Sequence, residues 1–203
     1  MRYSYFSWAF VFVTGISAGL AAQVANASDK EKPRVAVLLT EGFQDAEALS
    51  PVFYLRELGV EPVIIGLQHG LVSAYNSEVR INVQKAINEV SPEEFVALVI
   101  PGGQSPATLR EDSRVIEFVK AIAEAKKPVA AICHGPQVLA RAGLLDGLRA
   151  AAFPGIAEEV KAAGGTFLDQ EVVIDGTFIT SRLPKDIPAF NTALGEMIKK
   201  TRG

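Results

Sequence analysis

The sequence is poor in cysteine and histidine. Its 203 residues include a single cysteine, Cys133, and two histidines, His69 and His134. One cysteine cannot form an intramolecular disulfide, and three such residues spaced so widely make no metal-site pattern. We therefore expect neither a disulfide framework nor a structural metal, and the lone thiol itself becomes a feature to explain.

Positive charge is not in excess either. Lysine and arginine number 20 against 23 aspartates and glutamates, which gives a net charge of −3. Without a basic surface, nucleic acid is not an expected partner. No G-x-G-x-x-G follows the first expected strand, and G-x-x-x-x-G-K-[ST] is absent from the sequence. These absences argue against dinucleotide and P-loop binding, so we expect no cofactor.

The first 27 residues differ in kind from the rest. Arg2 precedes a mostly apolar run from Phe6 to Ala22, and Ala25-Asn26-Ala27 places small residues at positions −3 and −1 of a cut after Ala27. This pattern is typical of a secretory signal peptide. The alternative is an uncleaved N-terminal membrane anchor, because a run of about 17 to 25 apolar residues can also span a bilayer.

We accordingly expect three segments: a signal peptide at 1–27, a linker at 28–33 and one folded domain at 34–203. Export to the periplasm or beyond follows from this division, with no stable membrane association once the signal is removed.

Strands and helices alternate along the remaining chain. Apolar runs predict core strands, and helical spacing of apolar residues predicts helices between them. The expected strands are 34–40, 62–66, 97–100 and 128–132, the helices 45–58, 113–125, 135–142, 156–163 and 187–200, with a hairpin at 70–83 and a strand pair at 172–180. This order predicts an α/β fold with a three-layer, mostly parallel, doubly wound sheet and a ligand site beyond the carboxyl ends of its strands.

Cys133 stands where a buried strand turns into a helix, in Ala131-Ile132-Cys133-His134-Gly135. Small residues two positions before and after the cysteine are typical of a nucleophile elbow, because a tight strand-to-helix turn leaves no room for larger side chains there. The following helix N-terminus would favour a thiolate and lower the cysteine pKa. The alternative is an ordinary strand end with a buried thiol.

Other residues near the expected site carry complementary chemistry. The backbone N–H groups of Gly102, Gly103 and His134 are candidates to hold an oxyanion. Glu47, at the start of the first helix, is a candidate buried acid that hydrogen-bonds to the sulfur, although an acid there can also simply complement the helix dipole. His134 is the better candidate for moving protons, because His69 lies in a glycine-rich loop.

These motifs resemble those of the ThiJ/PfpI family, in its PfpI-like branch. The matching stretches are E-G-F-Q-D-A-E at 41–47, V-I-P-G-G at 99–103, A-I-C-H-G-P-Q-V-L-A at 131–140, F-P-G-I at 153–156, V-V-I-D-G at 172–176 and T-S-R-L-P-K-D-I-P-A-F at 180–190. The resemblance implies a flavodoxin-like sandwich, a homo-oligomer, and catalytic roles for Cys133, His134 and Glu47. It does not select one activity, because the family's reported activities include peptidase, glyoxalase, deglycase, chaperone and stress-sensing functions.

Several positions depart from that family pattern. Ala107 stands where protease-type relatives carry an acid that orients the histidine of a neighbouring subunit, so a Cys-His-acid triad lacks its third member. Glu111 and Asp112, about one helical turn further on, are candidate substitutes. Phe153 replaces a tyrosine and thereby removes a hydroxyl group. Two further replacements make the rim less charged: Gln44 and Gln104.

Three functions follow from these residues. The first is a Cys133-dependent enzyme acting on small reactive carbonyls or their protein adducts, glyoxalase- or deglycase-like, which needs no complete triad. The second is a stress-related thiol sensor or holdase in which Cys133 oxidises reversibly. The third is a PfpI-type cysteine peptidase, which Ala107 disfavours because amide hydrolysis needs a well-oriented acid for its poor leaving group.

Overall fold

The computed structural model describes residues 32–202. The expected signal peptide lies outside the described residues. Within the described part, no helix is both long and apolar enough to cross a membrane.

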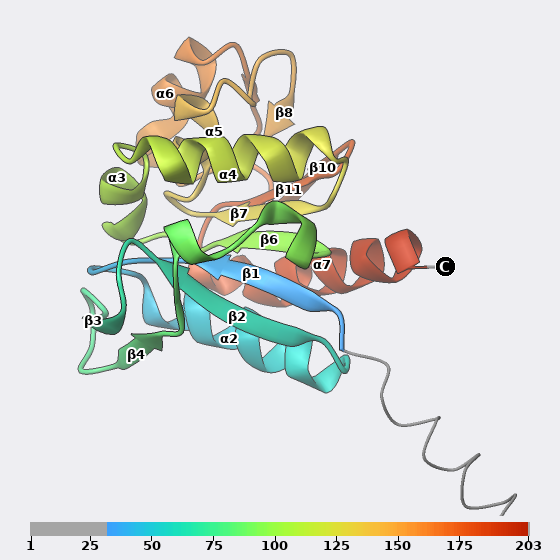
Figure 1. Ribbon diagram of the computed structural model, residues 1–203. Coiled ribbons are helices and arrows are strands. Elements are labelled where there is room, and N and C mark those ends of the chain that lie inside the picture. Colours follow the sequence, from blue (N-terminus) through green and yellow to red (C-terminus); the bar gives the residue numbers. More distant parts are fainter. Residues whose placement is uncertain (1–31, 203) are drawn as a thin grey trace, which may run out of the picture. The chain divides into compact units, whose positions relative to one another are not determined.

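Seven strands of the described chain form one sheet, in the order β10-β11-β7-β6-β1-β2-β5. Neighbouring strands run parallel, except that β10 is antiparallel to β11. In chain order they are β1 (Arg34–Leu38), β2 (Glu61–Gly66), β5 (Lys85–Ala86), β6 (Ala97–Ile100), β7 (Val129–Ile132), β10 (Val172–Asp175) and β11 (Phe178–Ser181). The carboxyl ends of β1, β6 and β7 therefore meet at one edge of the sheet, as Figure 1 shows.

Both faces of this sheet are buried. Alternate residues of β1 enter opposite cores: Ala36 and Leu38 join one apolar cluster, whereas Val35 and Val37 join the other. Because side chains of a strand alternate between its two faces, this division requires a helical layer on each side. The parallel strands are accordingly near-continuous apolar runs.

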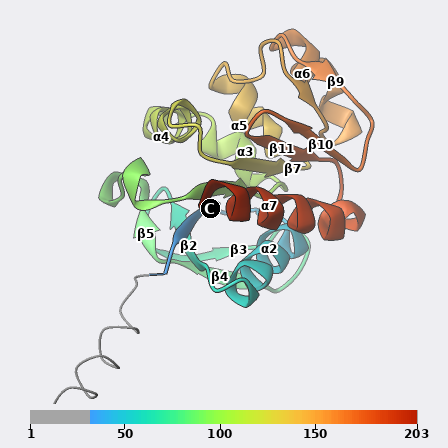
Figure 2. The same cartoon turned by 90° about the vertical axis from the view of Figure 1, so that its right-hand side faces the viewer.

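Two helical layers cover the sheet. On one side lie α2 (Asp45–Glu57) and α7 (Ile187–Arg202), and on the other α3 (Ser105–Leu109), α4 (Ser113–Glu124) and α5 (Pro136–Arg141), followed by α6 (Ala157–Ala162). Figure 2 shows α2 and α7 side by side below the sheet and α4 and α5 above it. The flavodoxin-like three-layer fold predicted from the sequence is thus the fold of this chain.

Short elements were not all expected. The hairpin predicted at 70–83 is present as β3 (Gly70–Ser73) and β4 (Arg80–Val83), and the strand pair after it is β10 and β11. The helix α3, the edge strand β5 and the small ribbon of β8 (Arg149–Ala150) with β9 (Thr166–Phe167) were not predicted. Elements of two to five residues are too short to show a periodic pattern. Single-turn 3₁₀ segments occupy 87–89, 92–94, 154–156 and 184–186.

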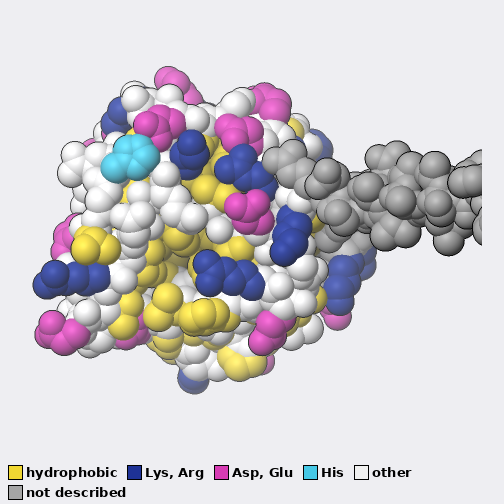
Figure 3. Space-filling view, turned by 60° about the horizontal axis from the view of Figure 1, so that its bottom comes forward, with side chains coloured by type: hydrophobic (Ala, Val, Ile, Leu, Met, Phe, Trp, Pro, Cys, Tyr) yellow, Lys and Arg dark blue, Asp and Glu magenta, His cyan; other side chains and the backbone are white. Residues whose placement is uncertain are grey.

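One side of the molecule displays apolar side chains. Figure 3 brings forward the side with α2 and the β3–β4 hairpin, and apolar side chains gather near its middle with charged ones around them. In the described chain, three large apolar residues exposed by half or more come from these elements: Phe53, Leu71 and Tyr75. A surface of this kind is one that a partner can cover.

Candidate active site

Cys133 occupies the sharp turn predicted for a nucleophile. It follows β7 directly, and its backbone has a φ of +60°, a value that residues other than glycine rarely adopt. Its N–H donates to the Ser181 carbonyl at 3.0 Å, and its carbonyl accepts from the Phe153 N–H at 2.9 Å. At Gly135 an added Cβ would lie 2.4 Å from the Ile100 oxygen, so this position of the turn admits only glycine. The elbow is therefore held from both neighbouring segments.

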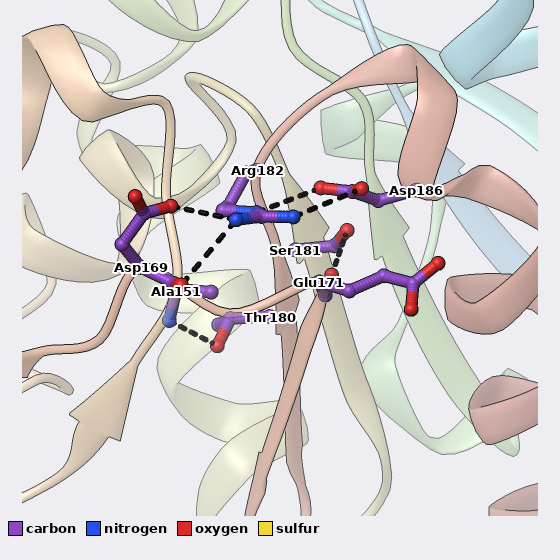
Figure 4. Close-up of polar contacts among 7 residues, drawn as sticks. All are labelled: Ala151, Asp169, Glu171, Thr180, Ser181, Arg182 and Asp186. Atoms are coloured by element: carbon purple, nitrogen blue, oxygen red, sulfur yellow. Dashed lines mark hydrogen bonds and ion pairs between the residues drawn. The ribbon is translucent and has the colours of Figure 1, made fainter.

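The segment that follows β11 fixes one side of this elbow. Arg182 donates to Asp186 at 2.9 Å and to Asp169 at 2.7 Å, while the Ser181 hydroxyl donates to the Glu171 carbonyl at 2.7 Å. Figure 4 shows the guanidinium of Arg182 between the two carboxylates. Because the Ser181 carbonyl also accepts from the Cys133 N–H, this network helps to hold the backbone of Cys133 in its strained conformation.

Glu47 enters the site from the first turn of α2. Gln44 caps that helix by accepting from the Glu47 N–H at 2.7 Å. The Glu47 side chain is fully buried, and its Oε2 accepts from the Gly102 N–H at 2.9 Å. Its other oxygen, Oε1, is buried and has no hydrogen-bond partner among the described residues. A buried carboxyl oxygen without a partner is costly, which suggests a group that holds a proton or awaits a ligand.

The glycines at the end of β6 make room for this carboxyl. A Cβ added at Gly102 would lie 2.6 Å from both Cys133 Cβ and Glu47 Oε2, so the two side chains approach each other across the space that glycine leaves empty. Gly103 has a φ of +84°, and its added Cβ would lie 2.5 Å from the Gly42 oxygen. Close approach of the loops thus requires glycine at both positions.

Burial raises the pKa values of both Glu47 and Cys133. Burial raises the pKa of Glu47 to about 7, although hydrogen bonds from Gly102 and Cys133 oppose this rise. Burial first, and the charge of Glu47 second, raise the pKa of the Cys133 thiol to about 12. The two acids therefore compete for one negative charge, and the thiolate forms most readily when the proton lies on Glu47.

Two sequence expectations need correction here. The pKa of Cys133 is raised rather than lowered, because the sulfur is buried and lies beside the Glu47 carboxyl. The expected oxyanion donor Gly102 instead gives its N–H to Glu47. The N–H groups of Gly103 and His134 do act on the sulfur, and both lower its pKa.

His134 reaches the sulfur within its own chain. Its Nδ1 lies 3.3 Å from Cys133 Sγ, and its ring stacks on Phe153 at a centroid distance of 4.7 Å and an angle of 27°. Burial lowers the pKa of His134, and the charge of Glu159 opposes that change. A neutral imidazole at this distance can accept the proton of the thiol and, once protonated, return it. His69, in contrast, is exposed and paired with Glu89.

Glu159, whose charge raises the pKa of His134, was not identified from the sequence. Ala107 is exposed in α3, and the substitutes considered for it are engaged elsewhere: Asp112 caps α4 and binds Arg114, while Glu111 pairs with Arg110 at 3.6 Å. Glu159, in α6, lies 26 residues from Cys133 in the sequence and belongs to none of the motifs. No short-range pattern would have pointed to it.

The rim of the site is formed by the β3–β4 hairpin. The backbone of Phe43 forms isolated β-bridges with Ala74 of the hairpin and with Gly103. The Tyr75 N–H also donates to the Phe43 carbonyl at 3.1 Å. Asp45 accepts from the Asn76 amide at 2.9 Å, a bond that is the main cause of its lowered pKa. Asp45 thus faces the hairpin at the helix start, whereas Glu47 faces the sulfur. Among the described residues, no group of three His, Cys, Asp or Glu side chains is placed to hold a metal ion.

Comparison with known proteins gives consistent similarities. The model of the DJ-1/PfpI family matches residues 33–197. Protein/nucleic acid deglycase 2 of Escherichia coli (strain K12) is 44% identical over 160 residues, which cover 78% of this chain and 93% of that protein. General stress protein 18 of Bacillus subtilis (strain 168) is 40% identical over 169 residues, covering 82% and 98%.

A solved structure agrees in fold and sequence. The two-domain protein of Anabaena variabilis, described as containing DJ-1/ThiJ/PfpI-like and ferritin-like domains, superposes with a TM-score of 0.79 at 36% identity. The superposition covers 80% of this chain and 47% of that longer chain.

Proposed function

Because the chain belongs to the DJ-1/PfpI family, we propose that it is a Cys133-dependent enzyme that acts on reactive carbonyls or on the adducts they form with proteins. The observation that carries this proposal is the buried Glu47 carboxyl beside a cysteine held at a positive φ. A cysteine in a strained backbone conformation next to a group that titrates near neutrality is typical of catalytic sites. The name of the Escherichia coli relative adds support for deglycase chemistry.

The first chemical step would be addition of the sulfur to a carbonyl carbon. As the carbon–sulfur bond forms, the carbonyl π electrons move to oxygen, and the thiol proton passes to the Glu47 carboxylate. Since the pKa of Glu47 is about 7, this carboxyl can both take and return a proton near neutral pH. The proton returned to the alkoxide completes a hemithioacetal, so that Glu47 serves as base and then as acid.

The surrounding groups would assist the same step. The N–H groups of Gly103 and His134 favour negative charge on the sulfur as its proton leaves. His134, with Nδ1 at 3.3 Å from Sγ, supplies a second route for a proton to or from the adduct. Since Gly102 is engaged by Glu47, we assign it to holding the carboxyl rather than the oxyanion.

The experiment is to measure consumption of methylglyoxal, and release of amine from a methylglyoxal-treated peptide, by the wild-type chain and by variants. We expect Cys133→Ser to fall to the uncatalysed rate and Glu47→Gln to lose most of the activity. His69→Ala is a matched histidine control, because His69 is exposed and engaged with Glu89. Equal rates for the wild-type chain and Cys133→Ser would remove the proposal.

A second candidate function is reversible oxidation of Cys133 in a stress-related sensor. The unpartnered buried Oε1 of Glu47 favours it, because a protonated carboxyl there can donate to an oxygen added to the sulfur. Intact-mass measurement after mild peroxide treatment should show one added oxygen in the wild-type chain, which a thiol reductant removes, and none in Cys133→Ser. A thiol that stays unmodified at high peroxide would rule this function out.

We also propose that the chain is exported and cut after Ala27. The Ala25-Asn26-Ala27 pattern supports this proposal, and the family model begins only at residue 33. Expression of the full chain in a bacterium, followed by intact-mass analysis of the periplasmic fraction, should give a product that begins at Ser28. A full-length chain retained in the membrane fraction would instead favour the uncleaved anchor.

Finally, we propose that the protein forms a homo-oligomer. Phe53, Leu71 and Tyr75 support the proposal, because they are large, exposed apolar side chains of α2 and the β3–β4 hairpin. Light scattering coupled to size-exclusion chromatography should give a multiple of the subunit mass. A monomer at high concentration would contradict the proposal.

A further inference from the structure

Ala107 leaves the expected histidine-orienting position without a carboxyl, yet a carboxylate does reach the surroundings of His134. This carboxylate belongs to Glu159, on α6, the helix that follows Phe153 after one 3₁₀ turn. Because Phe153 stacks on the His134 ring, the start of α6 is tied to that ring. The Ile156 N–H donates to the Phe153 carbonyl at 2.9 Å and so fixes the path from the stacked ring to the helix.

Two donors hold the Glu159 carboxylate in place. The Gln137 amide donates to Oε2 at 2.8 Å, and the Arg110 guanidinium donates to Oε1. Gln137 is itself bound to the histidine, since its N–H donates to the His134 carbonyl at 3.0 Å. Glu159 is therefore connected to His134 through α5 on one side and through the Phe153 stack on the other.

The sulfur of Cys133 lies next to only one of the two ring nitrogens of His134. Nδ1 of His134 faces the sulfur at 3.3 Å, so Nε2 lies on the opposite edge of the ring. The charged and titratable groups around the ring are the Cys133 thiol and Glu47 on the sulfur side, and Glu159 with its partner Arg110 on the α6 side. Of these, Glu159 is the group whose charge raises the pKa of His134 against the effect of burial.

We propose that Glu159 is the positioning residue for His134, replacing from within the same subunit the carboxyl that Ala107 does not supply. The inference rests on the proposed function, in which His134 moves protons at the thiol. A carboxylate held near the ring by Gln137 and Arg110 favours the imidazolium that forms when His134 accepts a proton. No hydrogen bond joins Glu159 to His134 among the described residues, so Glu159 acts through its charge and through Gln137 and the Phe153 stack. The matched neighbour Glu158 points away: it is exposed and pairs with Lys161.

The test is an NMR titration of the histidine Cε1–H resonances in the full chain. Only two histidines are present, and His69 serves as an internal reference. In Glu159→Gln, which keeps the shape of the side chain, we expect the His134 midpoint to fall by about half a pH unit or more, with His69 unmoved. Glu158→Gln should leave both midpoints as they are. Circular dichroism establishes that each variant is folded.

The outcomes separate this inference from the proposed function. An unchanged His134 midpoint in Glu159→Gln, or an equal fall in Glu158→Gln, overturns the positioning role whatever the enzyme activity. If the midpoint falls as expected, Glu159→Gln should also lower kcat/KM for methylglyoxal by about tenfold, because general acid–base steps contribute at least that much. If wild type and Cys133→Ser consume methylglyoxal equally, the proposed function fails, and the titration still decides the role of Glu159.

Discussion

Replacing Glu47 by glutamine should remove a loss of stability that the wild-type protein suffers as the pH rises. Burial raises the pKa of Glu47 from its ordinary value of 4.5 to about 7 in the folded chain. Between these two values the unfolded chain has lost the proton while the folded chain keeps it. The contribution of Glu47 to the free energy of unfolding is therefore fully present below pH 4.5, and it is lost as the pH rises through about 7.

The size of this effect follows from the same two values. One pH unit corresponds to about 1.4 kcal/mol of differential proton binding. The difference between the folded and unfolded pKa of Glu47 thus lowers the free energy of unfolding by about 3 kcal/mol across this range. The lowered pKa of His134 has the opposite effect near pH 6.5: because the buried imidazole is neutral, it makes the folded protein more stable as the pH rises.

Urea unfolding followed by circular dichroism, at several values from about pH 4.5 to about pH 8, measures the effect. This range stays below the titration of the Cys133 thiol, whose pKa is about 12. Because both proteins retain His134, the difference between the curves of wild type and Glu47→Gln isolates the carboxyl. We expect the wild-type curve to fall relative to that of the variant by about 3 kcal/mol. Parallel curves would refute a buried Glu47 carboxyl that titrates near neutrality.

Three further predictions concern the groups around the elbow. Gly102→Ala inserts a Cβ 2.6 Å from side-chain atoms of Cys133 and Glu47, so urea unfolding should show a loss of about 2 kcal/mol, and a neutral effect would contradict the close packing. Arg182→Ala leaves the buried Asp186 carboxylate without its partner and should lower the melting temperature clearly more than Lys161→Ala, whose pair with Glu158 is exposed; equal melting temperatures would be the contrary result. Glu47→Gln removes one cause of the raised pKa of Cys133, so the pH profile of iodoacetamide alkylation should move to lower pH, and a move to higher pH would count against the charge coupling.

Most of the fold was predictable because its elements are long enough to show a pattern. The runs at 34–40, 97–100 and 128–132 are apolar on both faces, which only a parallel strand between two helical layers explains. Each of them is a central strand of the sheet. The helix at Ser105–Leu109 is too short to show a pattern, and the two-residue strands are defined by pairing with neighbouring strands rather than by local sequence.

The site divides in the same way. Cys133 and His134 are visible in the sequence because a tight turn requires small residues at fixed spacing around its nucleophile, and Gly102 and Gly103 because a strand end followed by two glycines is a local feature. The position of Glu47 in the first helix was also apparent. Its burial was one of two expectations that position alone left open, because a helix-start acid can also simply complement the helix dipole, and the fold decides between them.

What the sequence by itself determined is the set of local constraints: the strand-to-helix turn at Cys133, the order of strands and helices, and the loops at the ends of the strands. Tertiary structure alone decided the electrostatics. The pKa of the thiol rises because the fold buries it beside Glu47, and the acid whose charge raises the pKa of His134 is Glu159, from the distant helix α6. Acidity depends on solvent exclusion and on charges from distant parts of the chain, and neither is encoded within the few residues of a motif.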